Sequence, residues 1–174
     1  MWTCRPATPD DAGFMARLHA ANLRRAWGLP EGLADPALDS LIAQQHQWRE
    51  TAYAAAHGRA GCQLIVRTSD GQPLGRCWVA AGETLHLVDL AVLPGEQGQG
   101  VGRWALGELQ AQAQARGLDL TLEADPQQAA HALYLRCGFV PDGPTQPAEA
   151  AGTDQRLRWH CPARAAHDLT GEPT

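Results

Sequence analysis

Residues 90–104 read LAVLPGEQGQGVGRW, and this stretch decides the fold. An apolar, strand-like run ends at Pro94. The glycines that follow stand at every second position: Gly98, Gly100 and Gly102. Because glycine has no Cβ, such a turn can bend sharply and let a ligand approach its backbone amides. Apolar residues at helical spacing follow, and the unpaired first amides of a helix carry partial positive charge. The stretch therefore predicts a phosphate cradle over residues 97–103.

The sequence on either side of the turn places it inside a mixed α/β domain. Hydrophobic periodicity and turn residues predict strands at 2–5, 62–68, 73–80, 84–93, 118–124, from 139 and at 155–161, and helices at 9–26, 37–56, 101–117 and 125–136. Asp70-Gly71 is typical of a hairpin turn, and Thr8, Pro9 and Asp11 resemble a capping box. This order of elements predicts one mostly antiparallel central sheet flanked by helices.

Composition limits the classes of partner. The chain has 174 residues, enough for one domain with its own core. Its net charge is -5, and all fourteen basic residues are arginine. Without a basic excess or a basic run, the sequence argues against nucleic-acid binding.

Residue usage also allows predictions about the cellular compartment and about metal binding. No stretch approaches the roughly 18 apolar residues of a membrane span, and the first 30 residues lack an apolar signal core. We therefore expect no membrane association. Five cysteines lie far apart with no CxxC pair and no Cys/His cluster. This usage favours a reduced, cytoplasmic protein without a metal site.

Three phosphate-binding patterns compete for the glycine turn. A Walker loop needs a lysine, and the chain has none. Residues 100–105 fit the dinucleotide pattern GxGxxA with Glu123 about 20 residues on, but residues 94–99 separate the turn from its strand. A nicotinamide-dependent oxidoreductase is thus one alternative function. Residues 97–102 also satisfy the acetyl-coenzyme A pattern Gln/Arg-x-x-Gly-x-Gly/Ala.

With its surroundings, that third pattern resembles the GNAT superfamily of N-acetyltransferases. Residues 125–140, DPQQAAHALYLRCGFV, resemble the family's second block, which here comprises Ala130, Leu133, Tyr134, Gly138 and Phe139. The opening strand and helix are also similar, so the resemblance covers residues 1–160. The chain departs from the common pattern with Gln97 in place of arginine and Gln127 in place of asparagine.

The resemblance implies an acyl-CoA N-acyltransferase fold over residues 1–161, followed by a flexible tail, 162–174. Acetyl-coenzyme A would lie in a cleft where strands 84–93 and 118–124 splay apart. The residues that the resemblance assigns to the cofactor are Leu90, Ala91, Val92, Gln97, Gly98, Gln99, Gly100, Val101, Gly102, Arg103, Gln127 and Tyr134.

The implied reaction is direct attack of a primary amine on the thioester. Tyr134 would return a proton to the thiolate, and the Val92 amide would stabilise the oxyanion. His86 is our candidate base, because some relatives carry an acidic base at the positions that match His86 or Val88. Asp89 and Glu123 are the alternatives.

The acceptor stays open between a small molecule and a peptide. Trp27, His46, Trp48 and Tyr53 lie in the variable region that shapes the acceptor pocket in this family, but their helical spacing is also typical of a core. A module that binds coenzyme A without turnover is a second alternative function. The sequence leaves open whether two chains pair as a homodimer.

Overall fold

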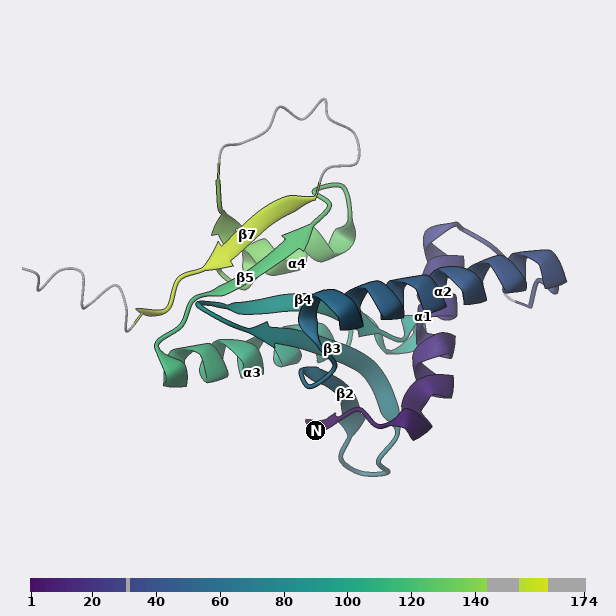
Figure 1. The fold of residues 1–174 in the computed structure, drawn as a ribbon, viewed down its shortest axis with the longest axis horizontal. Coiled ribbons are helices and arrows are strands. Elements are labelled where there is room, and N and C mark those ends of the chain that lie inside the picture. Colours follow the sequence, from purple (N-terminus) through teal and green to yellow (C-terminus); the bar gives the residue numbers. More distant parts are fainter. Residues whose placement is uncertain (31, 144–153, 163–174) are drawn as a thin grey trace, which may run out of the picture. The chain divides into compact units, whose positions relative to one another are not determined.

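The computed structural model describes residues 1–30, 32–143 and 154–162. In this part of the chain seven strands form a sheet in the order β1-β2-β3-β4-β5-β7-β6 (Figure 1). The strands are β1 Trp2–Pro6, β2 Cys62–Arg67, β3 Pro73–Ala81, β4 Leu85–Val92, β5 Leu120–Ala124, β6 Val140–Pro141 and β7 Gln155–Trp159. The α-helices are α1 Ala12–Ala26, α2 Pro36–His57, α3 Val101–Arg116 and α4 Ala129–Arg136. Short 3-10 turns, η1 Pro9–Asp11 and η2 Pro94–Glu96, precede α1 and follow β4.

Strand pairing confirms the predicted mixed α/β fold with a mostly antiparallel sheet. β1 with β2, β2 with β3, β5 with β7 and β6 with β7 pair antiparallel, whereas β4 and β5 pair in parallel. The tail predicted at 162–174 lies outside the described residues from position 163 on. Residues 144–153, between the strands predicted from 139 and at 155–161, also lie outside the described part of the chain.

The chain divides into two compact units. The first comprises Met1–Trp78 and Asp89–Gly102, and the second comprises Val79–Val88 and Arg103–Thr174. β3 and β4 each contribute residues to both units.

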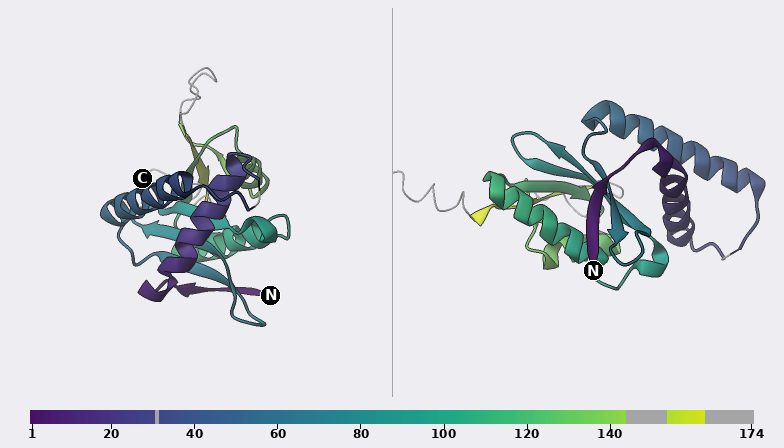
Figure 2. Two further views of the ribbon diagram at one scale, coloured as in Figure 1. Left: turned by 90° about the vertical axis from the view of Figure 1, so that its right-hand side faces the viewer. Right: turned by 90° about the horizontal axis from the view of Figure 1, so that it is seen from below.

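The first unit contains β1, β2, α1 and α2, with parts of β3 and β4. α1 and α2 pack together and cross rather than run parallel (Figure 2). The predicted capping box is confirmed: the Thr8 amide donates to the Asp11 carboxylate at 2.8 Å, and Arg5 pairs with the same carboxylate at 2.7 Å. The core consists of apolar side chains that are almost fully buried, among them Leu18, Ile42, Leu64, Ile65 and Trp78.

The second unit contains α3 from Arg103 on, β5, α4, β6 and β7, with the hairpin between β3 and β4. One face of its strands carries the buried residues Leu85, Leu87, Leu120, Leu122 and Leu157. The Gln110 side chain on α3 donates to the Cys137 carbonyl at the end of α4, at 2.7 Å. Side chains alternate along a strand, so the opposite face of these strands is polar. It bears His86, Thr121 and Arg158.

The start of α4 differs from the prediction. The sequence predicted a helix from residue 125, with Asp125 as cap and Pro126 in the first turn. Instead the Asp125 carboxylate accepts from the Gln127 amide at 2.8 Å, and its carbonyl accepts from the Gln128 amide at 3.0 Å. These bonds close a separate turn, so the helix begins only at Ala129.

Candidate functional site: a glycine turn between strand β4 and helix α3

The predicted glycine turn joins β4 to α3. η2 follows the strand, and α3 begins at Val101, whose side chain is buried. Gly98 and Gly100 have φ of 78° and 91°, in the left-handed region that other L-residues rarely adopt. The first amides of α3 have no acceptor within the helix. The turn thus has the backbone that an anion cradle requires.

A pair of side-chain amides holds this turn to the end of β4. Gln97 Nε2 donates to the Val92 carbonyl at 2.9 Å and to Asn22 Oδ1 at 2.8 Å. Asn22 Nδ2, on α1, donates to the same Val92 carbonyl at 3.1 Å. The Val92 peptide, whose amide is our predicted oxyanion donor, is therefore fixed from its carbonyl side. Sequence reasoning missed Asn22, because nothing local to α1 marks its partner 70 residues on.

Strands β3 and β4 approach each other closely at Gly75. A Cβ built on Gly75 would overlap the Ala91 carbonyl oxygen and lie 3.2 Å from the Val92 Cα. Only glycine fits this approach without displacing β4. The Leu93 amide donates a hydrogen bond to the Leu74 carbonyl at 2.8 Å. Gly75 therefore sets the position of the backbone at Ala91 and Val92.

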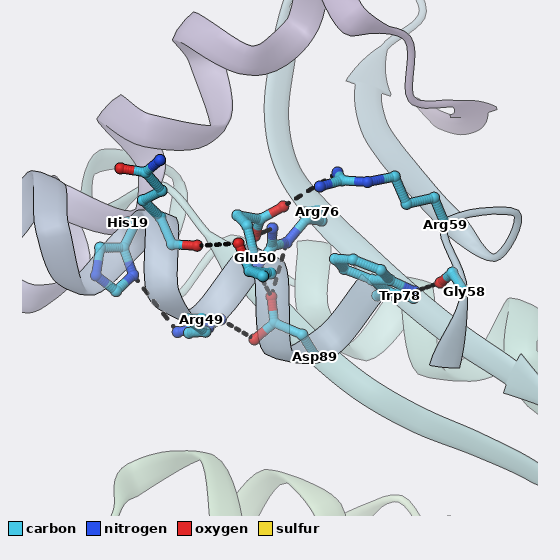
Figure 3. Close-up of polar contacts among 10 residues, drawn as sticks. His19, Arg49, Glu50, Gly58, Arg59, Arg76, Trp78 and Asp89 are labelled. Atoms are coloured by element: carbon cyan, nitrogen blue, oxygen red, sulfur yellow. Dashed lines mark hydrogen bonds and ion pairs between the residues drawn. The ribbon is translucent and has the colours of Figure 1, made fainter. Parts of the chain in front are cut away.

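A buried ion cluster ties β4 to α2 one residue before the predicted pantetheine segment 90–92 (Figure 3). Arg76 on β3 is 3% exposed and donates to Asp89 through Nε at 2.8 Å and through Nη2 at 2.7 Å. It also pairs with Glu50 on α2. Arg49 on α2 pairs with the other oxygen of Asp89. Both oxygens of Asp89 are thus held by arginines.

Burial and neighbouring charges shift the pKa values of two members of this cluster. Burial lowers the pKa of Arg76, but the charges of Asp89 and Glu50 outweigh it and hold that pKa above its usual value. Burial, with a smaller contribution from the Arg49 charge, lowers the pKa of His19 to about 4. His19 is therefore neutral near pH 7. Arg59 also pairs with Glu50, at 3.9 Å, so three arginines face two carboxylates. The network links α1, α2, β3 and β4.

Tyr134 and the other predicted residues of the second block lie in the second unit. Tyr134 on α4 is 8% exposed and packs edge-on against Phe139, with ring centroids 6.0 Å apart. Gln127 is exposed in the turn before α4, and Arg103 is exposed in the first turn of α3. Leu90 to Gly102 belong to the first unit, so the predicted cofactor residues are divided between the two units.

His86, the predicted base, lies half-buried on β4 in the second unit. Its Nδ1 is 3.1 Å from Thr121 Oγ1, on the neighbouring strand β5. Together with Arg156 and Arg158 of β7 it lines a cavity of about 460 Å³. Glu123, the third candidate base, is exposed on β5 and stands opposite Arg156.

The aromatic residues of the helical region separate into two groups. Trp48 is 75% exposed and Trp27 is also exposed, so neither belongs to the core. Tyr53 is half-buried and packs edge-on against the buried Trp78, 5.8 Å between ring centroids. His46 lies beside His19, with ring centroids 5.3 Å apart. The core interpretation is therefore wrong for the two tryptophans.

Comparison with known families decides the relationship. The model of the acetyltransferase (GNAT) family matches residues 26–139. The chain belongs to the GNAT acetyltransferase family. The match includes the glycine turn and the block that carries Tyr134. No curated protein sequence is similar enough to count as a relative.

Solved structures agree on the fold. PaiA N-acetyltransferase from Thermoplasma acidophilum, in complex with coenzyme A, has a TM-score of 0.64 at 12% identity, over 92% of this chain and 99% of its own. A protein described as histone acetyltransferase HPA2 and related acetyltransferase, from Corynebacterium glutamicum, has a TM-score of 0.64 at 22% identity, over 99% and 98%. The ribosomal-protein-S18-alanine N-acetyltransferase of Escherichia coli has 0.58 at 19% identity, over 91% of both chains. At these low sequence identities, the similarity shows only that the folds are alike.

The described residues contain neither a membrane-spanning helix nor a metal-binding cluster. None of the helices in residues 1–30, 32–143 and 154–162 has the length and apolarity needed to cross a bilayer. In the same part of the chain no group of three or more His, Cys, Asp or Glu side chains is arranged to hold a metal ion.

Proposed function

We propose that this protein transfers an acetyl group from acetyl-coenzyme A to a primary amine. The observation that carries the proposal is the glycine turn at the start of α3, in a chain of the acetyltransferase family. Gly98 and Gly100 adopt conformations that keep side chains out of the turn. The amides of residues 98–102 would bind the pyrophosphate, assisted by the positive end of the helix.

We assign the remaining donor contacts from the same segment. The backbone of Leu90, Ala91 and Val92 would pair with the pantetheine amides. Gln97 has its side-chain amide bonded to Asn22 and Val92, so we assign it the role of holding the turn in place. Arg103 would add a charge-assisted bond to a phosphate, and Gln127 a polar contact to the pantetheine arm.

The chemistry needs proton transfer and charge stabilisation rather than a covalent enzyme intermediate. Acetyl-coenzyme A supplies an activated thioester; the C–N bond to the amine forms and the C–S bond breaks. His86 stands six residues before Val92 on β4, roughly 20 Å along the strand, so it would accept the proton of the amine nitrogen through water rather than by direct contact. The Val92 amide would stabilise the negative charge on the carbonyl oxygen. Tyr134 would donate a proton to the departing thiolate, as a general acid.

The direct test measures thiol release from acetyl-coenzyme A over a panel of primary amines. We expect turnover with at least one amine in the wild type and none in Gly100→Asp. Coenzyme A binding without turnover on any amine would contradict the transferase and favour a binding module. A thermal shift with nicotinamide nucleotides instead of coenzyme A would favour the oxidoreductase.

The role of His86 has its own test in the pH dependence of turnover. If His86 is the base, activity rises with pH through a limb that stays fixed when amines of different basicity are compared. His86→Gln should remove that limb, whereas the exposed Glu123→Gln should keep it. A fixed limb that survives in His86→Gln would exclude His86.

Free cysteines support the proposed cytoplasmic location. Cys62, Cys77, Cys137 and Cys161 are free thiols. Reduced thiols are the usual state of cysteine in that compartment.

A further inference from the structure

A polar cavity lies on the second unit, beside the hairpin that joins β3 to β4. Its volume is about 460 Å³, which falls in the range of small-molecule sites. The hairpin residues Ala80–Thr84 form one wall, and His86, Arg156 and Arg158 complete the lining. His86, the predicted base, and the two arginines therefore line the same cavity.

Strand register explains why these side chains meet. His86 on β4 pairs with Thr121 on β5, and Thr121 pairs with Arg158 on β7. Arg156 stands two residues from Arg158 and therefore on the same face. Two strand spacings, roughly 10 Å, separate β4 from β7. A small molecule and two side chains can bridge that width.

Arg158 is not available to a ligand. Its Nε donates to Asp142 at 3.0 Å, and its Nη1 donates to Asp119 at 3.1 Å. Asp119 is held further by the Cys161 amide at 2.9 Å. The hydrogen bond from Arg158 holds the pKa of Asp142 below its usual range, so both partners stay charged. Arg158 therefore lines the cavity with its charge already offset by Asp142 and Asp119.

Among the lining residues Arg156 and Glu83 are the charges that remain, and Glu123 of β5 stands opposite Arg156 outside the lining. Within the described residues the single ion pair of Arg156 joins its Nε to Asp142, at 3.3 Å, and its side chain is 52% exposed. Glu83 is exposed at the hairpin and has no ion pair among the residues that the structure describes. The cavity thus offers one guanidinium and one carboxylate on the side of the molecule that carries His86.

We propose that this cavity recognises an amine acceptor that also carries a carboxylate, such as a free amino acid, with Arg156 binding the carboxylate. The proposal rests on the proposed function, with His86 as its base. Guanidinium and carboxylate form paired, charge-assisted hydrogen bonds. Glu83 attracts the ammonium form of the same molecule. A diamine would instead place a second cation against Arg156, and the amine of a protein terminus has no carboxylate beside it.

The test compares matched acceptors that differ by one carboxylate: lysine with cadaverine, and phenylalanine with phenethylamine. In the wild type we expect kcat/KM to be higher for the carboxylated member of a pair. Arg156→Gln should lower kcat/KM for that member roughly 10- to 100-fold, because a hydrogen bond to a charged group is lost, and should change the other by less than about threefold. Arg116→Gln, at an exposed arginine in the last turn of α3, is the matched control and should change neither.

The outcomes separate the two proposals. Transfer to amines with no preference for a carboxylate, or an equal effect of Arg156→Gln on both members of a pair, would overturn this inference and leave the acetyltransferase intact. No transfer to any amine, with coenzyme A bound, would overturn both. A thermal melt of each variant shows whether it is folded. Because the Arg156 side chain is half-exposed, we expect Arg156→Gln to fold normally.

Discussion

Gly75→Ala is the substitution whose effect the structure specifies most closely. The new Cβ would overlap the Ala91 carbonyl oxygen and lie 3.2 Å from the Val92 Cα. Optimal carbon–carbon separation is about 3.5–4.0 Å, and both neighbours are backbone atoms that cannot rotate away. β4 must therefore move by several tenths of an ångström or more. Overpacking of this kind costs roughly 1–3 kcal/mol in the free energy of unfolding.

Two measurements follow for this variant. Urea denaturation should show the loss of stability, and the melting temperature should fall by roughly 2–12 °C for a chain of this size. Because Ala91 and Val92 belong to the proposed pantetheine segment, isothermal titration should show weaker binding of coenzyme A. The loss of affinity should exceed what partial unfolding explains.

Gly107→Ala provides a control of opposite sign. Gly107 is exposed in the middle of α3, and nothing lies within 4 Å of the position that a Cβ would take there. Alanine at this position should raise the free energy of unfolding by roughly 0.5–1 kcal/mol and leave binding unchanged. If Gly75→Ala is as stable as the wild type, β3 and β4 do not approach each other as closely at Gly75 as described. If it is destabilised but binds coenzyme A normally, the pantetheine assignment to residues 90–92 is wrong.

Three further substitutions test other parts of the site and the fold. Gly100→Asp should abolish the thermal shift that coenzyme A produces, because φ of 91° disfavours a side chain and a carboxylate repels the pyrophosphate; a normal shift would place the phosphates elsewhere. Tyr134→Phe should keep coenzyme A affinity within a few-fold but lose roughly 10² in kcat, and full activity would reduce Tyr134 to packing. The hydrogen bond from Arg5 holds the pKa of Asp11 well below its usual value near 3.9, so its stabilisation is present above about pH 4 and is lost as pH falls through the folded-state pKa. Asp11→Asn should therefore be less stable than the wild type in urea at pH 7, with a difference that shrinks below pH 4; a constant difference would contradict the ion pair.

The helix that carries Tyr134 shows where local patterns reach their limit. Its end at Gly138 is a local feature, because glycine there has φ of 84° and ends the helix as predicted. Its predicted cap, Asp125, lies three residues before the actual cap, Gln128, because Asp125 can cap a helix or close a turn with the same side chain. The choice between them depends on bonds to Gln127 and Gln128 that the sequence pattern does not distinguish.

The sequence by itself determined the order of strands and helices and the glycine turn before α3. Both depend on periodicity and on backbone conformations that belong to single residues, such as Gly98 and Gly100. Only the tertiary structure decided what surrounds them: Gly75 against Ala91, and Arg76 between Asp89 and Glu50. These contacts join residues from separate elements, and they form only when strand register and helix packing bring distant side chains together.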